Sequence, residues 1–123
     1  MANENAQSPA VFAELKQALT PHASDLLVTA DTPEAYSLDT PYSEKWKKQL
    51  FFGSVEIKKN YVSVHLFPVY MYPDLLDAVS DDLKKRMQGK SCFNFKRPDP
   101  ALQEELVDLT RRGFDRLRSE GIV

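Results

Sequence analysis

Two strand-like segments separated by a short polar break constrain the fold of this chain more than any other feature. Leu50–Ile57 and Tyr61–Val69 are both rich in β-branched and aromatic residues, which favour strands. The break between them, residues 58–60, includes an asparagine, and asparagine tolerates the left-handed backbone of a tight turn. The sequence therefore predicts an antiparallel hairpin over residues 50–69.

The second segment of this hairpin has two different faces, because successive side chains of a strand point to opposite sides. One face is purely aliphatic and is expected to lie on the core: Val62, Val64 and Leu66. The other face carries aromatic and polar groups: Tyr61, Ser63, His65 and Phe67. Phe52 and Ser54 of the first segment are expected to join the second face.

Helix signals lie at both ends of the chain. Ser8-Pro9 predicts the start of a first helix, which Pro21 ends, and Asp99-Pro100 predicts the start of a long last helix. The apolar stripe of the last helix includes Gly113, where a close approach to the sheet is expected.

The middle of the chain predicts shorter elements. Residues 26–38 predict two short strands around a turn at 31–33, and residues 41–48 a loop. Pro73 and then Ser80 predict the starts of two short helices, with Gly89 as the helix stop. Residues 91–96 alternate in polarity and predict a further strand.

The order of these elements predicts an α+β fold. The strands cluster rather than alternate with helices, which favours an antiparallel sheet packed by the N-terminal and the long C-terminal helix, with a short helical insertion between strands. The length fits one domain, residues 8–123, preceded by a disordered N-terminus, residues 1–7.

Composition excludes several classes of function. The net charge is −2, whereas nucleic-acid binding needs a strongly basic face, so no nucleic-acid partner is expected. No apolar run approaches the roughly 18 residues of a membrane span, and the N-terminus lacks the pattern of a signal peptide. Cys92 is the only cysteine, so no disulfide can form within the chain. Together these features predict a cytoplasmic protein with no membrane partner.

Two segments, residues 54–70 and 83–96, resemble the YdhG-like family of small bacterial proteins of unknown function. The resemblance rests on a strand with a histidine, His65, followed later by Gly89-Lys90-Ser91 where a strand begins, and it extends from about Leu26 to Leu117. It implies a compact α+β fold with an antiparallel sheet flanked by helices. Some members are described as frataxin-like iron chaperones, so iron is implied as a cofactor by the resemblance alone; the residues themselves predict none.

The polar and aromatic side chains near the two segments form the candidate ligand site, namely Tyr61, His65, Tyr70, Lys90, Ser91 and Cys92. A phenol, an imidazole and an ammonium group that converge on a sheet face are typical of a small-ligand pocket. Three of these residues also have a purely structural interpretation. His65 could form its hydrogen bonds within the sheet, Lys90 could simply lie where a strand begins, and Cys92 could be a buried core residue.

The acidic residues Asp74, Asp77 and Asp81 are weak candidates for a metal site, because hard cations favour carboxylate oxygens. The cations 84–86 follow at once and oppose cation binding. Enzymatic activity is not expected, because no set of nucleophile, base and orienting group is apparent and Cys92 with His65 is the only candidate pair.

Three functions remain open from the sequence. The first is a small-ligand or accessory binding domain that uses the polar and aromatic sheet face. The second is a protein-interaction module, with a homodimer as one form, whose exposed aromatic residues form the contact. The third is an iron-binding protein similar to a chaperone. The partner is accordingly expected to be a small molecule or a protein.

Overall fold

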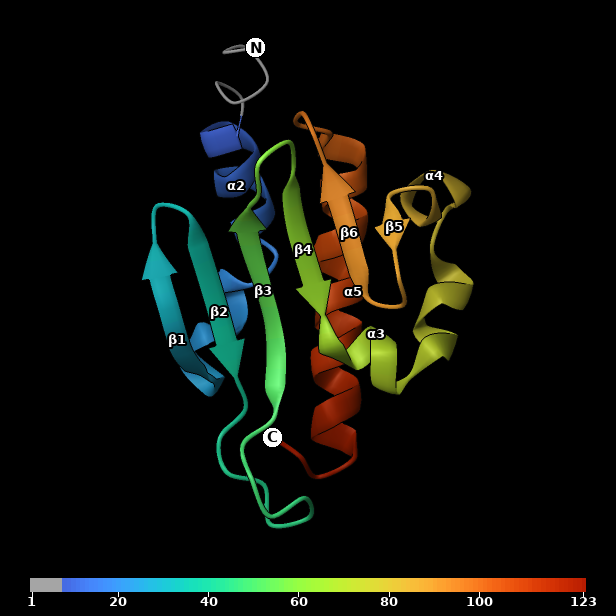
Figure 1. Cartoon of the computed structure of the whole chain (residues 1–123). Helices are drawn as coiled ribbons and strands as arrows, with labels where there is room; N and C mark the ends of the chain where they lie inside the picture. Colours follow the sequence, from blue (N-terminus) through green and yellow to red (C-terminus); the bar gives the residue numbers. More distant parts are fainter. Residues whose placement is uncertain (1–7) are drawn as a thin grey trace.

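A six-stranded antiparallel sheet lies at the centre of the computed structural model, which describes residues 8–123 (Figure 1). The predicted disorder of residues 1–7 lies outside the described residues. The strands are β1 Leu27–Thr32, β2 Ala35–Asp39, β3 Phe51–Ile57, β4 Val62–Leu66, β5 Met87–Gln88 and β6 Cys92–Phe95. Their order across the sheet is β1-β2-β3-β4-β6-β5, and every neighbouring pair is antiparallel.

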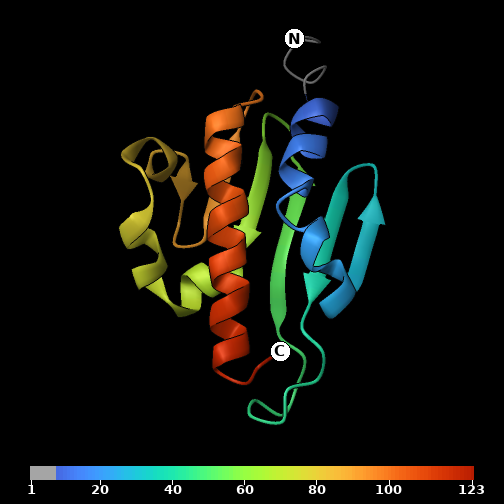
Figure 2. The same cartoon turned by 180° about the vertical axis from the view of Figure 1, so that it is seen from behind.

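Helices cover only one face of this sheet, as Figures 1 and 2 show from opposite sides. The covering helices are α2 Ser8–Lys16, the 3₁₀ helix η1 Thr20–Asp25 and α5 Pro100–Ser119. The short helical insertion between β4 and β5 comprises α3 Phe67–Met71, η2 Pro73–Ala78 and α4 Asp81–Lys84. The predicted α+β fold is confirmed. No described helix lies over the opposite face, which we call the open face.

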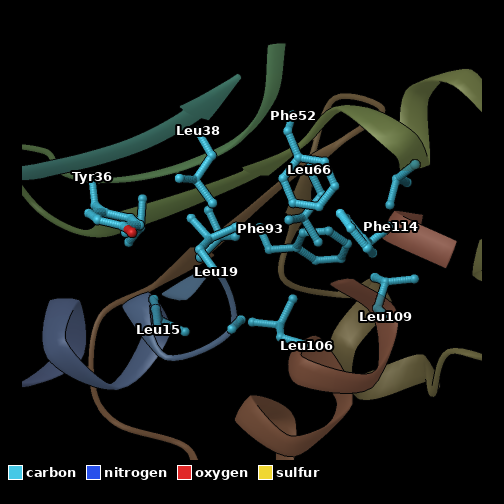
Figure 3. Close-up of a cluster of buried hydrophobic side chains, with 14 of the residues drawn as sticks. Leu15, Leu19, Tyr36, Leu38, Phe52, Leu66, Phe93, Leu106, Leu109 and Phe114 are labelled. Carbon is cyan, nitrogen blue, oxygen red and sulfur yellow. The ribbon is translucent and has the colours of Figure 1, made fainter. Parts of the chain in front are cut away.

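The core lies between the sheet and its covering helices (Figure 3). Val62, Val64 and Leu66 are buried there, so the aliphatic face of the predicted hairpin is confirmed as the core face. Ser63 and His65 are only partly buried on the open face. Two of the predicted helix caps, Ser80 and Asp99, are also present: Leu83 N donates to Ser80 Oγ and Leu102 N donates to Asp99 Oδ1, each at 3.2 Å.

The second hairpin segment is shorter than predicted. Strand β4 ends at Leu66, and the residues predicted to extend it to Val69 form α3 instead. Pro68 lies in the first turn of α3, where its fixed φ suits a helix and its missing N–H is not needed. As a result, Tyr70 lies on a helix at the end of the sheet.

The expectation that Phe52 joins the open face is wrong. The pairing of β2 with β3 shifts between Leu38 and Asp39, and this bulge reverses the alternation of side chains along the start of β3. Phe52 is therefore fully buried in the core. Phe51 takes its place on the open face, with its ring centroid 4.9 Å from that of His65.

The prediction that Gly89 ends a helix is wrong. Helix α4 ends at Lys84, and Met87–Gln88 forms the short strand β5, which pairs with β6. Gly89 instead lies in the turn between these strands, where its φ of 79° suits glycine.

Candidate functional site

Five of the six predicted site residues line one pocket at the end of the open face. They are His65, Tyr70, Lys90, Ser91 and Cys92. The pocket has a volume of about 390 Å³ and is also lined by Phe67. Its volume falls within the range of small-molecule sites, roughly 300–1,000 Å³.

The sheet register brings the two segments of this pocket together. His65 of β4 lies directly opposite Cys92 of β6, and Leu66 N donates to Ser91 O at 2.9 Å. The turn between β5 and β6 then places Lys90 beside the end of β4. The sequence separates these residues by some 25 positions, but the antiparallel pairing makes them neighbours.

Helix α3 adds an array of aromatic rings to the pocket. The ring centroids of Phe67 and Tyr70 lie 5.8 Å apart in a stacked arrangement, and that of Phe51 lies 6.3 Å from that of Phe67. Because Phe51 also contacts His65, the rings form a continuous aromatic surface from β4 to α3. Such ring pairs stabilise one another beyond the area they bury.

A second pocket of about 520 Å³ adjoins the first and shares Phe67, Tyr70 and Lys90 with it. It adds Trp46 and Lys48 from the loop between β2 and β3. Trp46 and Tyr70 are large aromatic side chains that remain 46% and 54% exposed. We call the two pockets together the aromatic groove.

Hydrogen bonds within the loop hold Trp46 and Lys48 at the groove. Ser43 pairs with Lys48 as an isolated bridge, and Trp46 N donates to Ser43 Oγ at 3.2 Å. Lys47 completes this tight loop with a positive φ of 59°. Sequence reasoning missed Trp46 and Lys48 as site residues, because only the tertiary fold brings this loop beside α3. A tryptophan among lysines in a polar loop was the signal that the sequence offered.

The aromatic groove has a positive electrostatic character. No aspartate or glutamate lines either pocket. Within residues 8–123, neither Lys48 nor Lys90 forms an ion pair. Burial lowers the pKa of His65, so this imidazole is neutral at pH 7, and the nearby carboxylate of Glu56 only partly opposes that effect.

Tyr61 is the one predicted site residue that the structure places elsewhere. It precedes β4 and lies four residues from His65, roughly 13 Å along an extended chain. It lines a different pocket on the open face, together with Lys85, Arg86 and Lys96.

The weak metal candidates do not form a metal site with one another. Asp74 accepts a hydrogen bond from Arg116 Nη1 at 3.0 Å, and this bond holds the pKa of Asp74 below its usual range. Within residues 8–123, no group of three histidine, cysteine, aspartate or glutamate residues is arranged to hold a metal ion. Asp77 and Asp81 also lie outside the aromatic groove.

Burial raises the pKa of the Cys92 thiol, although a hydrogen bond with Ser63 and the charge of Lys58 partly oppose this rise. The thiolate is the reactive form, so Cys92 should be a slow nucleophile at neutral pH. We expect it to react with Ellman's reagent at pH 7.5 about tenfold more slowly than free cysteine does. Unfolding in denaturant should remove the difference, and a folded-state rate equal to that of free cysteine would contradict this account.

Comparison of the chain with protein-family models, curated proteins and solved structures found no match. The resemblance to the YdhG-like family therefore stays a prediction. None of the described helices is both long enough and apolar enough to cross a membrane. Arguments about function accordingly start from the geometry of the aromatic groove.

Proposed function

We propose that this chain is a cytoplasmic binding domain for a small anion that carries a planar apolar group, held in the aromatic groove. One observation carries the proposal. Five residues from separate segments line one pocket, which shares an aromatic and cationic boundary with a second pocket. A concave site with apolar walls and a few convergent polar groups is typical of small-ligand binding.

Exposed aromatic rings support the planar part of the ligand. Trp46 and Tyr70 present large ring surfaces to solvent, and the stacked ring of Phe67 supports that of Tyr70. A planar ligand could cover these faces by stacking, which contributes about 0.5–1.5 kcal/mol for each pair of rings beyond the buried area. Aromatic side chains in a groove would therefore bind a ligand with a flat apolar face more strongly than one without it.

Uncompensated positive charge supports the anionic part. Lys48 and Lys90 line the groove without a carboxylate beside them. An anion at about 4 Å from one ammonium group gains about 1 kcal/mol in water and more where the groove excludes water. A neutral or cationic ligand would make no use of these two lysines.

The chemistry of Cys92 favours binding over catalysis. Cys92 and His65 face each other across β4 and β6, but the pKa of the thiol is raised rather than lowered. A nucleophilic cysteine needs a base or cation that stabilises its thiolate. The single cysteine remains a free thiol in the structure, which suits a reducing cytoplasm.

A second copy of this chain is a less suitable occupant of the groove. A two-fold contact places the same surface of both copies face to face. It would bring Lys48 and Lys90 against the same lysines of the partner and concentrate like charge. We therefore rank the homodimer below the small anion; sedimentation at high concentration should show a monomer.

Three small probes test the proposal, with Trp46 as the reporter because it is the only tryptophan. Benzoate has a ring and a charge, benzamide has the ring alone, and acetate has the charge alone. Benzoate should change the Trp46 fluorescence saturably with a Kd of about 1 mM, as expected for so few atoms. Benzamide and acetate should bind several-fold more weakly.

Matched variants locate this binding. Tyr70→Ala and Lys90→Ala should each weaken benzoate, whereas Lys59→Ala, in the turn between β3 and β4, should leave it unchanged. The proposal fails if benzoate has no saturable effect at tens of millimolar, or if benzamide binds equally well.

The affinity for benzoate should rise as the pH falls from 7 to 5. The pKa of His65 lies below its ordinary value, so His65 is neutral at pH 7 and gains a positive charge as the pH falls through its pKa. That charge attracts the bound carboxylate, which stays ionised over this range. The same fluorescence titration at several pH values measures the effect. His65→Gln should bind with little pH dependence, and an equal rise in that variant would contradict the assignment.

A further inference from the structure

A third pocket, at the other end of the open face, is lined by cationic side chains. It has a volume of about 370 Å³ and is lined by Tyr61, Lys85, Arg86 and Lys96, together with the side chains of Gln88 and Asn94. We call it the basic pocket. It shares only Gln88 with the aromatic groove, so its chemistry is separate from that of the proposed function.

Three separate segments converge on the basic pocket. Asn94 N donates to Arg86 O at 2.8 Å, which holds the chain before β5 beside β6. Tyr61 directly precedes Val62, which pairs with Phe95 next to Lys96. The side chain of Asn94 also donates from Nδ2 to Gln88 Oε1 at 2.7 Å. Backbone and side-chain bonds thus fix the residues around the pocket.

The cations of the basic pocket have few counter-charges. No aspartate or glutamate lines it, and in the part of the chain that the structure describes Lys85 and Lys96 form no ion pair. Arg86 has one long contact, 3.7 Å from Nη2 to Asp99 Oδ2, and its guanidinium lies 5.7 Å from the ring centroid of Phe95.

The arginines of α5 provide a contrast. All four form an ion pair with an aspartate, namely Asp108, Asp115, Asp74 or Asp25; the arginines are Arg111, Arg112, Arg116 and Arg118. The helical side of the molecule thus neutralises its cations internally. The three cations line one pocket, and among the described residues the distant Asp99 is their only ion-pair partner. They repel one another, and an anion between them would offset that repulsion.

We propose that the basic pocket binds the phosphate group of a small soluble molecule. A guanidinium group, two ammonium groups and the phenol of Tyr61 supply more hydrogen-bond donors than the two oxygens of one carboxylate can use. A phosphate offers three or four oxygens and up to two negative charges. The planar fork of Arg86 suits two of those oxygens, and Lys85 and Lys96 act as point charges.

Pyrophosphate is the probe that tests this site, since it has the charge but no ring for the aromatic groove. The full chain, labelled with ¹⁵N, is titrated with pyrophosphate while sodium chloride keeps the ionic strength constant. Saturable shifts of the amides of Tyr61, Lys85, Arg86 and Lys96 are expected. The affinity should fall about tenfold in the double variant Lys85→Ala/Lys96→Ala, as for the loss of two partly exposed charge pairs.

A matched double variant controls for net charge. Arg111→Ala/Arg118→Ala removes two positive charges from the helical side, and its affinity for pyrophosphate should stay within about twofold of that of the unmodified chain. Equal losses in both double variants would mean unspecific attraction and would overturn the proposal. The absence of saturable shifts at about 10 mM pyrophosphate, which corresponds to about the weakest useful affinity, would also overturn the proposal. Shifts confined to Lys48 and Lys90 would overturn it as well.

This outcome is independent of the aromatic groove. Tyr70→Ala, which should weaken benzoate, should leave the pyrophosphate affinity unchanged. Loss of the pyrophosphate site would therefore leave the benzoate result standing, and the reverse also holds.

Discussion

Replacing Phe93 with alanine is expected to lower the free energy of unfolding by about 3–5 kcal/mol. Phe93 lies on β6 with its side chain fully buried in the core between the sheet and its helices (Figure 3). The smaller residue removes the burial of a whole ring and leaves a cavity that a packed core cannot close. Urea denaturation, followed by circular dichroism, measures the change.

An exposed aromatic side chain outside the core provides the matched control. Tyr70 is 54% exposed and stacks on the ring of Phe67, so Tyr70→Ala should lower the free energy of unfolding by less than about 1 kcal/mol. Equal losses for the two variants would contradict the burial of Phe93 in the core.

The second large effect is expected at Gly113, where α5 crosses close to α3. A Cβ atom at this position would lie 2.8 Å from Cβ of Pro68 and 3.2 Å from its Cγ. A proline ring cannot rotate away, so Gly113→Leu must push α3 and α5 apart. We expect a loss of about 3 kcal/mol, even though leucine favours a helix more than glycine does.

Val107→Leu, on the exposed side of the same helix, should change the stability by less than about 0.5 kcal/mol. If Gly113→Leu were equally harmless, the close contact between α5 and α3 would be contradicted. Because α3 carries Phe67 and Tyr70, Gly113→Leu should also weaken benzoate binding, whereas Val107→Leu should not.

Local signals predicted much of this fold. Ser80 and Asp99 act as helix caps because their side chains accept backbone N–H groups, a preference visible in sequence. Alternation along residues 62–66 identified the core face, since only one side of that strand is apolar. Gly113 was predicted to allow a close approach, but its neighbour is Pro68 of α3 rather than a strand.

Features that depend on long-range contacts were not predictable. The bulge opposite Leu38 and Asp39 reverses Phe51 and Phe52, and no local pattern shows it. His22 stacks on Phe114 at 4.8 Å between ring centroids, a contact between η1 and α5 that no local pattern shows, and partial burial lowers its pKa.

The candidate site likewise combines residues that local patterns identified with residues that only long-range contacts bring together. His65 and Cys92 were recognised individually, because an imidazole and a thiol stand out on a strand. Trp46 and Lys48, which line the adjoining pocket of the aromatic groove, come from a loop whose position only the folded chain determines. The end of β4 at Leu66 has the largest effect on the site. The chain turns there into α3, which places Phe67 and Tyr70 in the aromatic groove, and a longer strand would not do so.

The central claim is that the aromatic groove binds a planar anion, and a map of amide shifts in the ¹⁵N-labelled chain with benzoate tests it most directly. Shifts should concentrate at Trp46, Phe67, Tyr70 and Lys90, and α5 residues on the opposite side from the open face, such as Arg111, should stay unchanged. Shifts that are scattered over the molecule, or that concentrate on α5, would contradict the claim.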